Sequence, residues 1–157
     1  MFNKQRILPN IIRTLSIALF MVALTQPCFD TENAPGDTGQ GAALVISGFF
    51  GFFSSAAGLT WLANPALWFA WVVIARKPGR SLYAGAMAMA MALGFLLCKD
   101  VMINEAGGVS NITNIRIGYS LWVGSIAVML LGCVLLKFIC RVDSPGKKSF
   151  RPEEYEE

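Results

Sequence analysis

The sequence contains no histidine and few charged residues. Of its 157 residues, 15% are charged and 55% are hydrophobic, which leaves too few polar residues to cover the surface of a soluble domain of this size. Histidine is a common zinc ligand and the usual base of serine hydrolases, and the four cysteines (Cys28, Cys98, Cys133 and Cys140) show no C-x-x-C spacing. We therefore expect one membrane domain without a metal, a cofactor, a catalytic site or an enzymatic activity.

An uncharged stretch dominates the middle of the chain. Residues 41–75 contain no charged side chain, and Arg76, Lys77 and Arg80 follow directly. About 20 helical residues span the hydrocarbon core of a bilayer, so these 35 residues are too many for one straight crossing and barely enough for two. Pro65 lacks a backbone N–H and disfavours helical geometry at Asn64, so we expect a helix break at this pair. The pair also fits the cap and first residue of a new helix.

Three further apolar segments have the length of a membrane span. They cover about residues 10–26, 81–98 and 117–137, and Tyr119 and Trp122 in the last one are typical of side chains at a membrane interface. The first segment also fits a cleaved signal peptide, but Thr25-Gln26-Pro27 lacks the small residues of a cleavage site. The sequence therefore favours a retained first helix.

The distribution of lysine and arginine indicates how often residues 41–75 cross the membrane. With one crossing, eleven of these bases lie on the cytoplasmic side and two outside, whereas two crossings leave five inside and eight outside. Because basic loops stay in the cytoplasm, one crossing is favoured. We expect residues 57–76 to form this span, with residues 42–56 interfacial or re-entrant. The alternative places the span at residues 42–60 and residues 65–75 under the inner leaflet.

The predicted fold class is an all-α integral membrane bundle with four transmembrane crossings and one broken or re-entrant apolar segment. Residues 1–140 form the transmembrane domain and residues 141–157 a charged cytoplasmic tail, so both termini face the cytoplasm. The two outer loops, residues 29–40 and 99–116, carry five acidic and two basic residues. We therefore expect an acidic outer face.

Small residues are expected to mediate helix packing. The third span carries two stripes of small residues at a spacing of four: Ala84, Ala88 and Ala92, and Ala86, Ala90 and Gly94. The stripes lie about 200° apart around the helix, so we expect this helix to pack between two neighbours. The expected partners are the lipid bilayer and either another membrane protein or a second copy of the chain. The formal net charge of +3 gives no indication of nucleic-acid binding.

Polar side chains at membrane depth gather in one part of the chain. They are Ser47, Ser54, Ser55, Thr60 and Asn64. They are able to line a small polar cavity. Hydrogen bonding between helices is the commoner role of such side chains, and it is favoured here.

Cys28 and Cys98 form a candidate disulfide. In the predicted topology both lie at the outer ends of spans, in an oxidising compartment, whereas Cys133 and Cys140 lie within and at the inner end of the last span. Two unpaired thiols are the alternative, and it is slightly favoured because the sequence fixes no Cα separation.

Three short motifs resemble a class of small bacterial multi-pass membrane proteins with no established activity. They are Trp61-Leu-Ala-Asn-Pro65 followed by Trp68 and Trp71, Asn104-Glu-Ala-Gly107, and Gly118-Tyr-Ser-Leu-Trp122. The resemblance covers about residues 28–140. It implies a bacterial inner membrane protein and assigns no functional residue.

The absence of catalytic groups favours a non-enzymatic binding or accessory subunit of a membrane complex. Two alternatives remain. One is an immunity-type protein that binds a toxin through the acidic outer loops. The other is a small pore or carrier built from the polar, glycine-rich residues 42–64, although no acidic or basic side chain lies at membrane depth there.

Overall fold

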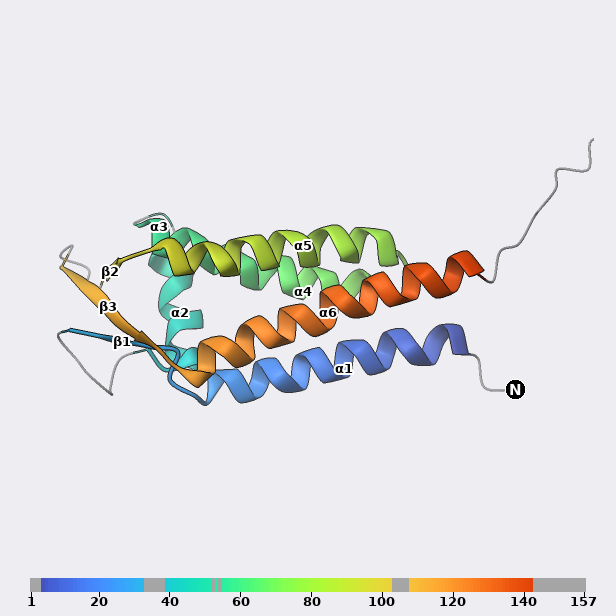
Figure 1. The fold of residues 1–157 in the computed structure, drawn as a ribbon, viewed down its shortest axis with the longest axis horizontal. Coiled ribbons are helices and arrows are strands. Elements are labelled where there is room, and N and C mark those ends of the chain that lie inside the picture. The colour runs from blue at the N-terminus through green and yellow to red at the C-terminus, as the bar shows by residue number, and fades with distance from the viewer. Residues whose placement is uncertain (1–3, 33–38, 52, 54, 103–107, 143–157) are drawn as a thin grey trace, which may run out of the picture.

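Four long helices lie side by side and give the molecule its elongated shape (Figure 1). The structure, a computed structural model, describes residues 4–32, 39–51, 53, 55–102 and 108–142. Within these ranges, four helices are long and apolar enough to cross a membrane: Ile7–Leu24, Ala56–Val73, Pro78–Leu97 and Ile117–Ile139. Each helix end lies within three residues of the bound expected from the sequence. Ser54, the motif at residues 104–107 and the tail from residue 143 onward lie outside the described residues.

The helices pack around one core in the order α1, α6, α5 and α4, and α4 in turn contacts α1 through Trp71 and Ser16. Helix α1 (Lys4–Leu24) lies along α6 (Ile117–Val142), α6 along α5 (Pro78–Gly94), and α5 along α4 (Ala63–Val73). The buried core runs along these contacts and includes Leu67, Ile74, Ile126, Met129 and Cys133. Burial of such apolar side chains against each other gives close packing between neighbouring helices.

Helix α5 lies between α4 and α6 as expected, but only one of its two stripes of small residues is buried. Ala88 and Ala92 are fully buried, whereas Ala86 and Ala90 are exposed. The expectation of two packed stripes was therefore wrong. Both neighbours approach α5 on the same side, so the opposite face needs no small residues for packing within the chain.

The long uncharged stretch is broken close to the expected boundary between residues 42–56 and 57–76, and not at Asn64-Pro65. Helix α2 spans Gly41–Gly51, and the chain becomes helical again at α3 (Ala56–Leu59). Between them Ser55 has extended backbone angles, φ −155° and ψ 162°, and its hydroxyl accepts a hydrogen bond from the Gly58 N–H at 2.9 Å. Ser55 is thus a helix N-cap, the favoured position of serine.

Asn64 and Pro65 lie inside helical structure, so the predicted break at this pair was wrong. A 3-10 turn, η1 (Thr60–Leu62), joins α3 to α4, and Pro65 is the third residue of α4. The carbonyl of Trp61, four residues earlier, is the acceptor that proline leaves without a donor. Pro65 lies in the first turn of α4, where a backbone N–H has no partner within the helix, which explains why proline is tolerated here.

A three-stranded antiparallel sheet covers one end of the bundle, so the fold is not all-α. Its strands are β1 (Phe29–Thr31), β2 (Asp100–Met102) and β3 (Val109–Ile115), in the order β1-β3-β2. Strand β3 precedes α6 directly and pairs with β1, which follows α1. The sequence of β3 is rich in β-branched residues that favour strands, but its polar residues led to the expectation of a loop.

An ion pair links strand β1 to the residue that follows strand β3. Arg116 Nε donates to Asp30 Oδ2 at 2.6 Å, and the Asp30 side chain is only 7% exposed. Nearby, Asn111 donates to the carboxylate of Glu32 at 3.0 Å. Two of the outer acidic residues predicted from the sequence, Asp30 and Glu32, therefore bind side chains within the protein. Asp37 and Glu105 lie outside the described residues.

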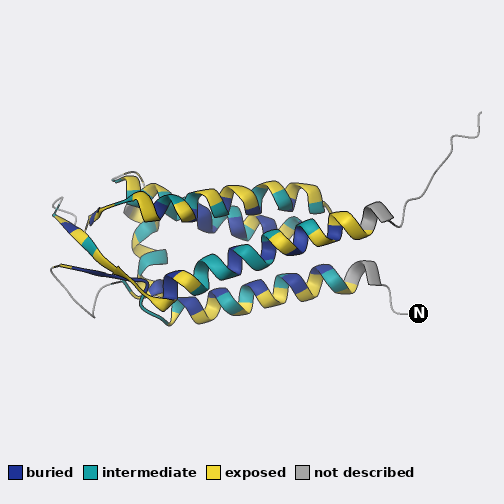
Figure 2. Cartoon of the chain, in the orientation of Figure 1, coloured by how far each residue is buried: buried dark blue, intermediate teal, exposed yellow. Residues whose placement is uncertain are grey.

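Many residues on the outward faces of the helices are exposed (Figure 2), and large apolar residues are among them. Examples more than half exposed are Ile11, Met21, Phe69, Val72 and Leu131. A water-soluble monomer rarely exposes contiguous apolar surface of this kind. The surface is therefore compatible with helices that face lipid.

Basic residues gather at the end of the bundle opposite the sheet. Figure 1 places the start of α1, the turn between α4 and α5, and the end of α6 at this end. The α4–α5 turn carries Arg76, Lys77 and Arg80, and α6 carries Lys137 in its last part. The two ends of the bundle thus differ in structure and in charge.

Candidate functional site

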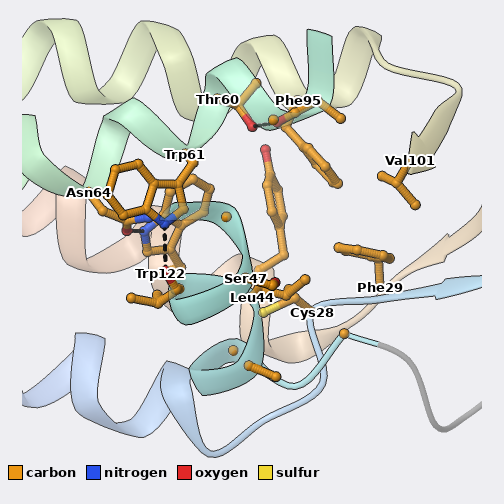
Figure 3. A pocket seen from close by; sticks show the side chains of 18 of the residues that line it. Cys28, Phe29, Leu44, Ser47, Thr60, Trp61, Asn64, Phe95, Val101 and Trp122 are labelled. Carbon is orange, nitrogen blue, oxygen red and sulfur yellow. Dashed lines mark hydrogen bonds between the residues drawn. The ribbon is translucent and has the colours of Figure 1, made fainter. Parts of the chain in front are cut away.

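A cavity of about 860 Å³ lies at the sheet end of the bundle. Its walls come from the end of α1, from β1, α2 and η1, and from the first turns of α6. Figure 3 shows Trp61, Asn64 and Trp122 on one side, and Phe29, Phe95 and Val101 on the other. The volume lies within the range of about 300–1,000 Å³ that small-molecule pockets occupy.

Aromatic rings line the side of the cavity next to the sheet. The ring of Phe95 lies 5.5 Å from that of Phe29 and 5.6 Å from that of Tyr119, and Tyr119 lies 5.8 Å from Trp122, all between centroids. The Tyr119 hydroxyl donates to the carbonyl of Ala92 at 2.8 Å. Each ring is therefore held by another ring or by a hydrogen bond, which keeps this wall in place.

Helix α2 closes another side of the cavity and is held by Trp61. The indole Nε1 of Trp61 donates to the carbonyl of Val45 at 2.8 Å, and its ring packs on the backbone at Gly48. A Cβ atom at Gly48 would overlap this ring. Glycine is required here because the indole occupies the space of any side chain.

Four of the five polar residues singled out from the sequence line this cavity: Ser47, Ser55, Thr60 and Asn64. Three of them also make hydrogen bonds within the protein. Ser55 caps α3, Thr60 donates to the carbonyl of Ala57 at 2.6 Å, and Asn64 accepts from Trp122 Nε1 at 2.9 Å. Only the bond of Asn64 links two long helices. The cavity interpretation and the hydrogen-bond interpretation therefore describe the same residues.

The part of the lining that the structure describes has no charged side chain. Three acidic residues adjoin lining residues along the chain: Asp30 pairs with Arg116, Glu32 accepts from Asn111, and Asp100 is exposed. Among the described residues, no group of three or more histidine, cysteine or acidic side chains is placed to hold a metal ion. The cavity offers shape, apolar surface and neutral hydrogen-bonding groups.

Cys28 lies in the cavity wall as a buried free thiol. Burial raises the pKa of this thiol from 9.0 to about 11, because the thiolate is poorly solvated. Cys98 is also a free thiol, and burial followed by the negative charge of Asp100 raises its pKa. The structure does not contain the candidate bridge: the Cys28 Sγ lies 3.9 Å from the Gln26 carbonyl oxygen, and the Cys98 Sγ 3.8 Å from that of Gly94.

Several lining residues were not identified as such from the sequence. Tyr119 and Trp122 were interpreted as interfacial anchors, and Phe29 and Phe95 carried no signal. Phe29 reaches Phe95 only because β1 pairs with β3, and this pairing joins segments more than 80 residues apart. Such a contact has no local pattern in the sequence.

Comparisons with known proteins give no further assignment of this cavity. No family model, curated protein or solved structure matches the chain.

Proposed function

We propose that this chain is a small integral membrane protein that binds an apolar molecule in the cavity at its sheet end and catalyses no reaction. The observation that carries the proposal is the cavity itself, about 860 Å³ in volume and lined mainly by apolar and aromatic residues. Concave, mainly apolar pockets of this size are the usual binding places of small molecules. Binding is therefore the role that best accounts for the cavity.

The proposed location is a bacterial inner membrane, with both termini in the cytoplasm. Four helices have the required length and hydropathy, and the start of α1 and the end of α6 lie at the basic end of the bundle (Figure 1). The positive-inside rule then places the sheet and the cavity on the outer side. Ligand would enter from the outer leaflet or from the space beyond it. Binding of this kind suits an accessory subunit, and a pore is less well supported because Leu67, Ile126 and Met129 fill the bundle beyond the cavity.

Photolabelling in lipid nanodiscs tests the proposal. The probe is a hydrocarbon of about 16 carbons that carries a diazirine and no head group. We expect saturable labelling of peptides that contain Phe29, Trp61 or Trp122, removed by excess unlabelled hydrocarbon. Labelling of the lipid-facing Phe69 and Val72 should instead rise linearly with probe concentration.

Two neighbouring substitutions in α2 provide a matched control. Ser47 lines the cavity, whereas Ile46 is 66% exposed and does not line it. We expect Ser47→Trp to fill the cavity and abolish the saturable labelling, and Ile46→Trp to leave it unchanged. Uniform labelling that excess hydrocarbon does not reduce in the wild-type protein would refute the proposal.

A further inference from the structure

We propose that the ligand is uncharged and carries a hydrogen-bond-accepting oxygen that binds the side-chain N–H of Asn64. This inference rests on the proposed binding function and adds the chemical class of the ligand. The proposed ligand is a neutral, lipid-like molecule with a carbonyl, ester or hydroxyl oxygen.

The orientation of the Asn64 amide is set by Trp122. An indole nitrogen only donates hydrogen bonds, so the atom that lies 2.9 Å from Trp122 Nε1 must be the amide oxygen Oδ1. The amide nitrogen Nδ2 then faces away from the indole with two N–H groups. The usual ambiguity between the oxygen and nitrogen of an asparagine is thereby removed.

Asn64 Nδ2 is a donor without a partner in the described part of the chain. The residue is only 4% exposed and lines the cavity, yet the one hydrogen bond of its side chain is that from Trp122 to Oδ1. Because Asn64 lines the cavity, an acceptor oxygen on a bound molecule would give this N–H the hydrogen-bond partner that it lacks within the described protein.

The charge of the lining selects a neutral ligand. The described lining residues include no acidic or basic side chain, so a carboxylate or an ammonium group would lose its hydration without gaining a counter-charge. That exchange is strongly unfavourable in an apolar site. A ketone, ester or hydroxyl oxygen avoids this cost and still accepts from Asn64.

The remaining walls fit the apolar body of such a molecule. Trp61, Asn64 and Trp122 lie on one side, and the rings of Phe29 and Phe95 lie on the other (Figure 3). A ligand with its oxygen at Asn64 would therefore direct its hydrocarbon portion toward these aromatic rings and the sheet. A single polar contact and a large apolar surface are the usual division of roles in such pockets.

A head-group series of photoprobes tests this inference with the full-length protein in nanodiscs. The probes share one diazirine-bearing chain of about 16 carbons and end in a hydrocarbon, a ketone, a hydroxyl group or a carboxylate. One neutral hydrogen bond is worth about fivefold in affinity. We expect the ketone and hydroxyl probes to label the cavity with about fivefold lower apparent Kd than the hydrocarbon, and the carboxylate to label it more weakly than either.

Variants then assign the preference to Asn64. We expect Asn64→Ala to lose the advantage of the ketone over the hydrocarbon while the hydrocarbon still labels saturably. Asn64→Ala combined with Trp122→Phe removes the indole N–H that the single variant would leave unpaired, and the same loss is expected. Thr25→Val is the control, because the Thr25 hydroxyl donates to the Val22 carbonyl and the residue does not line the cavity, so this variant should keep the advantage.

The possible outcomes separate the two proposals. Equal labelling by ketone and hydrocarbon in the wild-type protein, or equal labelling by ketone and carboxylate, would overturn the ligand class even if the variants fail to fold. Retention of the ketone advantage in a folded Asn64→Ala variant would also overturn it. Absence of saturable labelling by every probe would instead overturn the binding function itself.

Discussion

Ser16 joins three helices through one hydroxyl group. Its Oγ donates to the carbonyl of Ser125 in α6 and accepts from Trp71 Nε1 at the end of α4, both at 2.8 Å, and the residue is fully buried. Between apolar helices such bonds each contribute about 0.6 kcal/mol on average. Their main effect here is to fix the register of α1, α4 and α6, because apolar contacts alone allow neighbouring registers.

The two described cysteines near the sheet should differ in reactivity with pH. In single-cysteine variants we expect iodoacetamide to modify Cys28 slowly at pH 8, since a pKa of about 11 leaves about one thousandth of the thiol ionised. The rate should rise about tenfold per pH unit up to about pH 11. Cys98 is less buried and should react faster. Mass spectrometry after timed quenching measures both rates.

The same reagent distinguishes free thiols from a bridge. In the wild-type protein unfolded in dodecyl sulfate, Cys28 and Cys98 should both be modified without reductant. Modification that appears only after reduction would establish the disulfide and contradict the free thiols of the structure.

At the level of elements, the contact between α1 and α6 depends on glycine. A Cβ atom at Gly132 would overlap the side chain of Ile12, whereas a Cβ at Gly124 on the same helix meets nothing within 4 Å. The two positions therefore form a matched pair. Alanine at position 132 measures the cost of separating the helices, and alanine at position 124 measures only the intrinsic helix preference of alanine.

We expect Gly132→Ala to lower the free energy of unfolding by about 1–3 kcal/mol, as overpacking usually does. Gly124→Ala should be neutral or stabilise by up to about 1 kcal/mol, because alanine favours helices over glycine. Unfolding by dodecyl sulfate, followed by tryptophan fluorescence, measures both. Ile12→Ala in the Gly132→Ala background should restore part of the loss; equal effects of the two glycine substitutions would contradict this helix contact.

The helices could be predicted from the sequence, whereas the elements that connect them could not. Uncharged runs of about 20 residues identify membrane-compatible helices without any knowledge of their neighbours. Strand β1 has three residues, and its partner β3 lies about 80 residues further along the chain. Ser55 rather than Pro65 marks the break, because Pro65 lies in the first turn of α4, where proline is tolerated.

The cavity could be predicted in part. Its polar residues Ser47, Ser55, Thr60 and Asn64 lie close together in the sequence, so their clustering was visible without a structure. The aromatic wall was not visible, because Phe29 and Phe95 meet only through the sheet. Local composition therefore locates one side of the site, and only the tertiary fold completes it.

For the whole molecule, the orientation in the membrane is the property that decides where the cavity opens. The start of α1, the end of α6 and the basic α4–α5 turn lie at one end, and the sheet lies at the other (Figure 1). A single determination of sidedness therefore assigns every loop. It also decides whether ligand reaches the cavity from the cytoplasmic or the outer side.

Reporter fusions in a bacterial host measure this sidedness. We expect phosphatase and fluorescent-protein fusions after Pro78 and after Glu157 both to behave as cytoplasmic, because eleven of the thirteen basic residues lie on that side in the four-crossing topology. A cysteine introduced at position 113 should react with an impermeant maleimide added from outside, which would place this position on the outer side. An external signal from the Glu157 fusion would contradict an even number of crossings.

The pairing of β1 with β3 also sets the order in which the protein can be completed. Arg116, the ion-pair partner of Asp30, is synthesised 86 residues after it. At about 5–20 residues per second this interval is roughly 4–17 s. Through that interval the carboxylate has no counter-ion and the cavity lacks the wall that Tyr119 and Trp122 supply. The last of the described helices thus completes the cavity, so under the proposed function a ligand can be held only after this helix is in place.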